Sequence, residues 1–188
     1  FIYLRINNII KMVEKSQNRF EFLNDNLQLK IHPRIGVEII ENSSWQDDDE
    51  ILEMWAGILA SSCDNIGNDD SNLIFINILK SLTKPQARII NYLCQQSKTL
   101  KDKNGLFYAE GKCDISIEKL FEISEINSIS RLDREIDHLR SLDLLPSGGF
   151  TEGGGFSINQ EDFSKITLLA TPLALHFYGR VNGTKELI

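Results

Sequence analysis

The sequence has no apolar run long enough to cross a membrane, few cysteines and a deficit of positive charge. No stretch approaches the ~20 apolar residues that a membrane-spanning helix needs, and no signal-peptide pattern is present. The three cysteines, Cys63, Cys94 and Cys113, are odd in number and widely spaced, which argues against a disulfide framework or a metal knuckle. A net charge of −7 argues against a protein that coats nucleic acid without sequence preference and against a protein that binds anionic membranes. These absences favour a reducing, cytoplasmic setting.

The length of 188 residues allows one sizeable domain or two small ones. The chain begins at Phe1 without an initiator methionine, so we expect it to be the ordered part of a longer protein. The three histidines, His32, His138 and His176, show no metal-ligand spacing with each other or with cysteine. We therefore expect no metal and no cofactor.

The stretch from Ser43 to Cys63 predicts the central helix of a bundle. Ser44 is its expected cap, and the acidic run 47–50 suits a first helical turn, where the helix dipole favours negative charge. At about 100° per residue, apolar side chains cover well over half of the circumference and enclose Trp55. The strip expected to face water runs through Glu50, Glu53, Gly57 and Ser61, and its residues Glu50, Glu53 and Gly57 are the first candidate contact surface.

The opening helix carries a coiled-coil-like seam of apolar residues at alternating spacings of four and three. The seam contains Ile2, Ile6, Ile9 and Val13, is broken at Ser16, and resumes with Phe20, Leu23 and Leu27. Two outcomes are open. The seam packs inside the domain, which we favour, or it pairs with the same helix of a second copy of the chain.

The next segments continue the bundle. Pro33 suits the first position of a helix that ends near residues 42–44. Residues 63–70 are a loop rich in Asn, Asp and Gly, and Ser71 is the expected cap of a helix that is apolar nearly all round and should be buried.

From Thr83 the pattern changes to alternating helices and short strands. We expect a helix from Thr83 to about Gln95, short strands at 106–109 and 114–116, helices at 117–123 and 130–142, a strand at 165–170 and a last helix from Pro172. The glycine-rich segment 148–155 is expected to be a hairpin tip, because a phosphate loop needs a Lys-Ser/Thr pair that does not follow Gly155. The fold prediction is therefore mainly α: a helical bundle over residues 1–82, then a winged helix-turn-helix-like α+β domain over 83–188.

The central stretch resembles the Abi-alpha family, which is associated with abortive infection of phage-infected bacteria. The resemblance rests on Asp48-Asp49-Glu50-Ile51-Leu52 leading into Met54-Trp55-Ala56-Gly57-Ile58-Leu59-Ala60-Ser61, then Ile78-Leu79-Lys80-Ser81-Leu82 and Ala87-Arg88-Ile89-Ile90, with Arg5, Asn7 and Asn8 in the opening helix. It covers roughly residues 3–95, and the winged part resembles the family only in architecture. Gly57 departs from the polar residue expected there, and the hydrophobic leader of many members is absent. The resemblance implies phage defence, and it implies a membrane-linked activity only through that leader.

The helix at 130–142 is the second candidate contact surface. One side of it carries Ser130, Arg131, Arg134, His138 and Ser141, opposite the apolar residues. Arginine suits guanine edges and phosphates. However, Asp133 and Asp137 lie next to this side of the helix, and the phosphate backbone of DNA would repel them. The other interpretation is a solvated face with pairs such as Arg131 with Glu135.

We expect a non-enzymatic antiphage protein that acts through protein–protein recognition, with a protein partner or self-association. No serine, histidine and acid spacing indicates a catalytic triad, although such triads are spatial. The first alternative is a winged-helix transcription regulator that binds DNA, which the net charge disfavours. The second alternative is the regulatory part of a membrane-acting effector whose leader is absent here.

Overall fold

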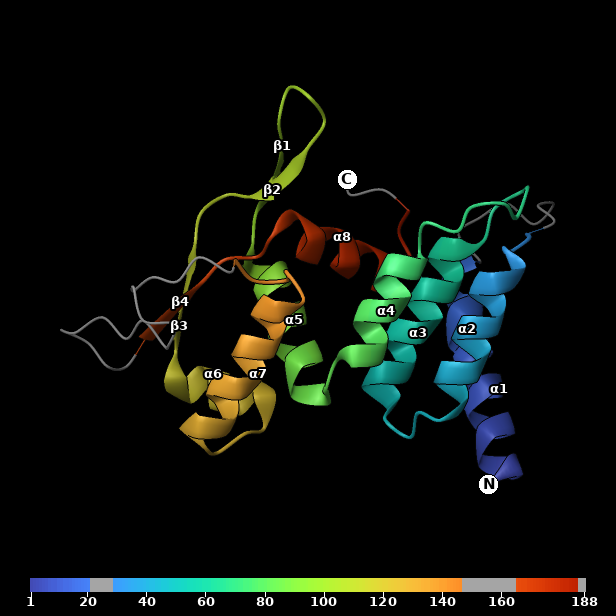
Figure 1. Ribbon diagram of the computed structural model, residues 1–188, viewed down its shortest axis with the longest axis horizontal. Helices are drawn as coiled ribbons and strands as arrows, with labels where there is room; N and C mark the ends of the chain where they lie inside the picture. The colour runs from blue at the N-terminus through green and yellow to red at the C-terminus, as the bar shows by residue number, and fades with distance from the viewer. Residues whose placement is uncertain (21–28, 147–164, 186–188) are drawn as a thin grey trace. The chain divides into compact units, whose positions relative to one another are not determined.

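The computed structural model describes residues 1–20, 29–146 and 165–185 and divides the chain into two compact units (Figure 1). Unit 1 comprises Phe1–Leu82 and Gly179–Ile188, and unit 2 comprises Thr83–Tyr178. The described residues are mainly helical, with two antiparallel sheets of two strands each, so the mainly α class is confirmed. The hairpin tip expected at 148–155, and the later seam residues Leu23 and Leu27, lie outside the described residues.

Unit 1 is a bundle built around one helix. Its helices are α1 (Ile2–Phe20), α2 (Pro33–Ser44), α3 (Asp49–Ser62) and α4 (Leu73–Ser81). Helix α3 contacts the other three, and Trp55 at its centre is 0 % exposed, which confirms the prediction of an enclosed central helix. The other large side chains of this core are Met12, Ile35, Ile39, Leu52, Ile58 and Ile76.

The predicted helix caps of unit 1 are partly wrong. Ser44 is the last residue of α2, and the N-cap of α3 is Asp48, whose carboxylate accepts hydrogen bonds from the backbone N–H groups of Glu50 and Ile51 at 2.9 and 3.1 Å. The N-cap of helix α4 is likewise Asn72 rather than the predicted Ser71. Asp48 is a good cap and lies four residues after the predicted Ser44, whereas Asn72 follows Ser71 directly and makes no side-chain capping hydrogen bond, its Nδ2 donating instead to Ser61 Oγ and Ser62 Oγ at 3.1 and 2.7 Å.

Helix α1 packs inside unit 1, but with a different face from the one predicted. The buried residues are Asn8, Met12 and Ser16, whereas Ile2 and Ile6 of the seam are 74 % and 48 % exposed. Asn8 Nδ2 donates to the carbonyl oxygen of Ser44 at 3.0 Å. The half-buried cations of this face are all paired with glutamates: Arg5 with Glu41, and Lys15 and Arg19 with Glu53. The helix therefore docks through hydrogen bonds and ion pairs as well as through Met12.

Unit 2 combines three packed helices with two small sheets. It contains α5 (Lys84–Gln96), β1 (Thr99–Lys101), β2 (Phe107–Ala109), β3 (Cys113–Ser116), α6 (Ile117–Ser124), α7 (Ile129–Ser141), β4 (Lys165–Leu168) and α8 (Pro172–Val181), of which the residues up to Tyr178 belong to this unit. Helix α5 contacts both α6 and α7. The core is apolar and includes Ile89, Ile90, Leu93, Leu120, Leu132, Ile136, Leu139 and Phe177.

The two sheets of unit 2 connect segments at different distances along the chain. Strands β1 and β2 form a local hairpin, in which Leu100 pairs with Tyr108. The sequence indicated β2 but not β1, which has only three residues. Strand β3 pairs antiparallel with the distant β4, with Ile115 opposite Ile166, and both of these side chains are buried. This pairing closes the helical core of unit 2 on one side.

Candidate recognition surfaces

Helix α7 forms where the sequence predicted it, because a cap and an apolar stripe agree. Ser128 is its N-cap, and its Oγ accepts a hydrogen bond from the backbone N–H of Arg131 at 3.5 Å. Leu132, Ile136 and Leu139 recur at helical spacing and are all buried. The side of α7 away from this stripe is the candidate surface, which we call the α7 face and define by Ser130, Arg131, Arg134, His138 and Ser141.

Four members of the α7 face are exposed: Ser130, Arg131, Arg134 and Ser141. Ser141 Oγ donates to the carbonyl oxygen of His138 at 2.7 Å, so this hydroxyl is bound to its own helix. Arg131 Nε lies 3.4 Å from Glu135 Oε1, the intrahelical pair named as the alternative to a binding role. Arg134 has no ion-pair partner among the described residues, so its guanidinium is open to a ligand.

His138 points instead into a polar network between α7 and the start of α5. Its Nδ1 lies 3.0 Å from Oε1 of Gln86, a residue that is only 2 % exposed. The same Oε1 accepts the backbone N–H of Thr83 at 3.0 Å, which identifies this atom as the amide oxygen. Because an amide oxygen only accepts, the proton between Gln86 and His138 belongs to Nδ1 of the imidazole. His138 therefore helps to fix α7 on α5 and is not free to bind a ligand through this nitrogen.

Glu135 completes this network. Its Oε2 accepts hydrogen bonds from Gln86 Nε2 at 2.7 Å and from Thr83 Oγ1 at 2.9 Å. Thr83 and Gln86 also form the capping box of α5. The sequence predicted the helix start at Thr83 and the α7 face, but neither the capping box nor its contact with α7, because 52 residues separate Gln86 from His138.

The charges of α7 balance. The helix carries three arginines and three carboxylates, and Arg140 Nη1 is paired with Asp137 Oδ1 at 2.7 Å. A surface that reads nucleic acid gains most of its non-specific affinity from uncompensated cations. The α7 face provides Arg134 and, in part, Arg131, which is a small excess for that purpose.

The exposed strip predicted on α3 is only partly exposed. Glu50 faces solvent, while Glu53 is half-buried and binds two cations, with Oε1 2.6 Å from Lys15 Nζ and Oε2 2.9 Å from Arg19 Nη2. Burial raises the pKa of Glu53, but the hydrogen bonds from Lys15 and Arg19 outweigh it, so the pKa lies below its ordinary value. Glu53 therefore joins α1 to α3.

The prediction that Gly57 and Ser61 face water is wrong, because both residues are buried. A Cβ atom added to Gly57 would overlap the backbone carbonyl group of Val181. The end of α8 belongs to unit 1 and packs closely on α3 at this point, which only a glycine permits. The sequence of α3 alone gives no sign of this contact, because its partner is more than 100 residues away.

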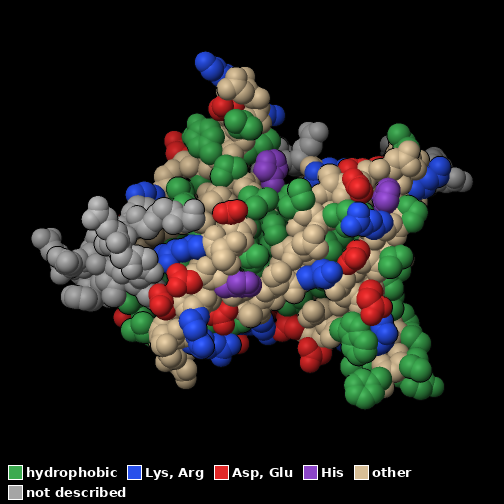
Figure 2. Space-filling model, in the orientation of Figure 1, with side chains coloured by type: hydrophobic (Ala, Val, Ile, Leu, Met, Phe, Trp, Pro, Cys, Tyr) green, Lys and Arg blue, Asp and Glu red, His purple; other side chains and the backbone are tan. Residues whose placement is uncertain are grey.

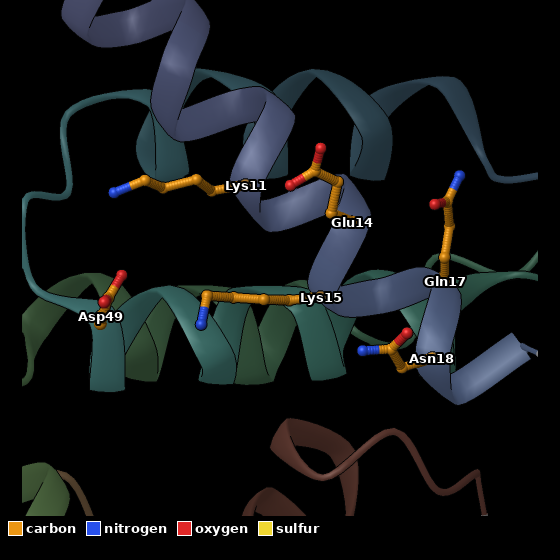
Figure 3. Close-up of a pocket in the computed structure, with 6 residues that line it drawn as sticks. All are labelled: Lys11, Glu14, Lys15, Gln17, Asn18 and Asp49. Atoms are coloured by element: carbon orange, nitrogen blue, oxygen red, sulfur yellow. The ribbon is translucent and has the colours of Figure 1, made fainter.

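A polar groove that sequence analysis missed lies along α1 and the start of α3. It has a volume of about 430 Å³ and is lined by Lys11, Glu14, Lys15, Gln17, Asn18 and Asp49. Figure 3 shows Lys11 and Lys15 extending from α1 towards the side on which Asp49 stands. The lining mixes both signs of charge, and Lys15 is already bound to Glu53. The groove therefore favours no single class of ligand.

No group of three His, Cys, Asp or Glu side chains in the described part of the chain is placed to bind a metal ion. None of the described helices is long and apolar enough to span a membrane.

Comparison with known protein families matches residues 5–167 to the family described as abortive infection alpha. The match extends well past the region on which the resemblance rested, through α7 and into β4. No curated protein and no solved structure matches the chain. Because the family match covers most of its length, this chain belongs to the abortive infection alpha family.

Proposed function

We propose that this chain is a non-enzymatic phage-defence protein that works in the bacterial cytoplasm and recognises a protein partner through the α7 face. Family membership supports the defence role. The balance of charges on α7 favours a protein partner over nucleic acid. Arg131 and Arg134 are exposed, but the helix carries three arginines and three carboxylates in all. Such a mixed surface suits a protein with complementary charges better than a uniformly negative polymer.

The architecture of unit 2 supports a winged-helix type of recognition module. The order α5, β3, α6, α7, β4 is that of a winged helix, and the antiparallel pairing of β3 with β4 supplies the sheet that such a fold places beside its helices. Helices α6 and α7 are joined by a short turn that begins with Glu125 in the left-handed region, at φ 56°. In this arrangement α7 is the recognition helix. Winged helices bind proteins as well as DNA, so the fold alone does not choose between them.

Charge reversal on the α7 face tests the proposal. The variant Arg131→Glu/Arg134→Glu should keep its fold, because both side chains are exposed, and should reduce protection in a phage plaque assay by tenfold or more. A matched control is Arg34→Glu/Lys103→Glu, which reverses two exposed cations elsewhere and should protect like the wild type. Full protection by the α7 variant would exclude this surface. Equal loss in both variants would indicate a general charge effect.

DNA binding is the second candidate, favoured by the exposure of Arg131 and Arg134 on a helix in the recognition position. A gel-shift titration of genomic fragments at physiological salt separates the two functions. One outcome is sequence-preferring binding with a dissociation constant of about 10⁻⁸ M that is abolished in the α7 variant but not in the control. This outcome would show that the α7 face binds DNA rather than a protein partner. If DNA binding is weak, disappears as salt is added and is the same in the α7 variant, the proposal of a protein partner stands.

A further inference from the structure

The fold leaves an apolar stripe of α1 uncovered. The stripe consists of Ile2, Tyr3, Ile6, Ile10 and Val13, which lie on one side of the helix and are 74, 85, 48, 49 and 38 % exposed. Figure 2 shows hydrophobic side chains gathered over the start of α1. Isolated exposed apolar residues are normal on a protein surface, whereas a continuous stripe marks an interaction site. This stripe runs beside the polar face that docks α1 on the rest of unit 1.

We propose that the α1 stripe is a self-association surface, by which two copies of this chain pair through their α1 helices. The spacing of Ile2, Ile6, Ile9 and Val13, alternately four and three, is the pattern by which one helix packs against another of the same kind. Within unit 1 α1 docks mainly through Asn8 and Met12, and of this pattern Ile9 is half-buried while Ile2, Ile6 and Val13 remain exposed. The sequence thus carries a helix-pairing pattern that the fold of one copy leaves largely exposed.

The charges around the stripe favour a second copy over a lipid surface. The stripe has no charged residue, so two copies related by a twofold axis can bring it together without opposing like charges. Its outer rim carries Lys11 and Glu14, which are opposite in sign. The other cations of α1 are already paired with Glu41 and Glu53. Residues 1–82 carry 7 Lys and Arg against 13 Asp and Glu, a balance that an anionic membrane repels.

The stripe is large enough for a small, weak interface between two copies. At the stated exposures its five residues present roughly 500 Å² on each copy, or roughly 1,000 Å² in a symmetric pair, taking about 150–200 Å² for each residue when fully exposed. This total is at the lower limit for a specific interface. We therefore expect a reversible dimer with a dissociation constant of the order of 10 µM.

Sedimentation equilibrium of the whole chain over about 1–200 µM tests this inference, because that range spans the expected constant. The wild type should shift from monomer to dimer, and Ile6→Glu/Ile10→Glu should weaken the dimer by at least about tenfold. The matched control is Ile66→Glu/Ile74→Glu, which places the same charges at exposed isoleucines outside the stripe, 69 % and 58 % exposed, and should dimerise like the wild type. Circular dichroism melting checks that all three proteins remain folded.

Two results would overturn the inference. The first is a wild type that stays monomeric up to the highest concentration, whether or not its stripe then binds phosphatidylglycerol vesicles or a host protein. The second is a stripe variant that dimerises as well as the control. The outcome is separate from that of the proposed function, since a monomer that still protects cells through the α7 face contradicts only the self-association.

Discussion

Replacing Gly57 by alanine tests how closely the end of the chain packs on the centre of α3. A Cβ atom at this position would overlap the carbonyl carbon and oxygen of Val181 and lie 3.0 Å from the backbone nitrogen of Asn182. All three atoms belong to the backbone, so no change of rotamer relieves the overlap. Alanine gains about 1 kcal/mol over glycine in a helix interior, whereas overpacking costs about 1–3 kcal/mol or more. Because the overlap is severe and falls on backbone atoms, we take the upper end of the overpacking cost, about 3 kcal/mol, and expect Gly57→Ala to lower the free energy of unfolding by about 2 kcal/mol after the helix gain.

The structure also predicts how the variant relieves the overlap. The end of α8 is held on unit 1 by the buried Val181, by Arg180 Nη1 at 3.5 Å from the carbonyl oxygen of Ser61, and by the Arg180 guanidinium 5.8 Å from the centre of the Phe75 ring. Because the overlap falls on this end segment, while α3 is packed against three other helices, the alanine variant should release the segment before α3 unfolds. Urea unfolding followed by tryptophan fluorescence measures the stability, and limited proteolysis with mass spectrometry detects early cleavage after residue 178.

Gly36→Ala is the matched control for this substitution. Gly36 lies within α2, and a Cβ atom there would make ordinary contact with Ile31 Cγ2 at 3.5 Å. Alanine at this position should therefore stabilise the protein by about 0.5–1 kcal/mol through helix propensity alone. If Gly57→Ala proved as stable as Gly36→Ala, the close approach of Val181 to α3 would be refuted.

Two further predictions follow from the environments of titratable groups. Glu53→Gln should cost about 0.5–1 kcal/mol at neutral pH by weakening the pairs with Lys15 and Arg19. The pKa of Glu53 in the folded protein lies below its ordinary value of 4.5, so its contribution to stability is complete above pH 4.5 and is lost as the pH falls through the folded pKa. Urea titrations of the wild type and Glu53→Gln across acidic pH should therefore show their difference in the free energy of unfolding vanish. Burial raises the pKa of the Cys94 thiol to about 12, so iodoacetamide at pH ~8 should label the two half-buried cysteines of the native protein well before Cys94, as peptide mapping will show. Rapid labelling of Cys94 in the folded protein would contradict its burial in α5, where its Sγ lies 3.6 Å from the carbonyl oxygen of Ala174 at the start of α8.

Local signals in the sequence predicted most of the helices, because each depends on residues only a few positions apart. Pro33 begins α2, Thr83 and Gln86 form the capping box of α5, and Ser116 caps α6. These interactions are complete within one turn of helix, so a pattern can show them without knowledge of the fold. The same holds for the enclosure of Trp55, since an arc of apolar residues wider than half a helix must be covered from several sides.

The candidate surfaces were harder to predict, because burial of a polar or small residue depends on a distant partner. His138 and Gln86 are equally plausible as surface residues when each helix is considered alone, and only the meeting of α5 with α7 makes them one network. Gly57 falls on the least apolar side of α3, which periodicity assigns to solvent, yet the end of α8 covers it. A small residue on a polar strip is as compatible with close backbone packing as with exposure.

Helix α1 shows why an apolar pattern does not by itself identify the buried side of a helix. The pattern gives the position of the stripe, but what covers a helix depends on its neighbours, and α2 and α3 present Glu41 and Glu53 to α1. Half-buried Arg5 is hydrogen bonded to Ser44 Oγ at 3.0 Å and stacks on the Trp45 ring at 4.4 Å, so its loss of hydration is compensated by specific partners. Once α1 is fixed by polar contacts, Ile2, Ile6 and Ile10 remain 74, 48 and 49 % exposed. The ion pairs that orient α1 are therefore also what leaves the stripe free for a second copy.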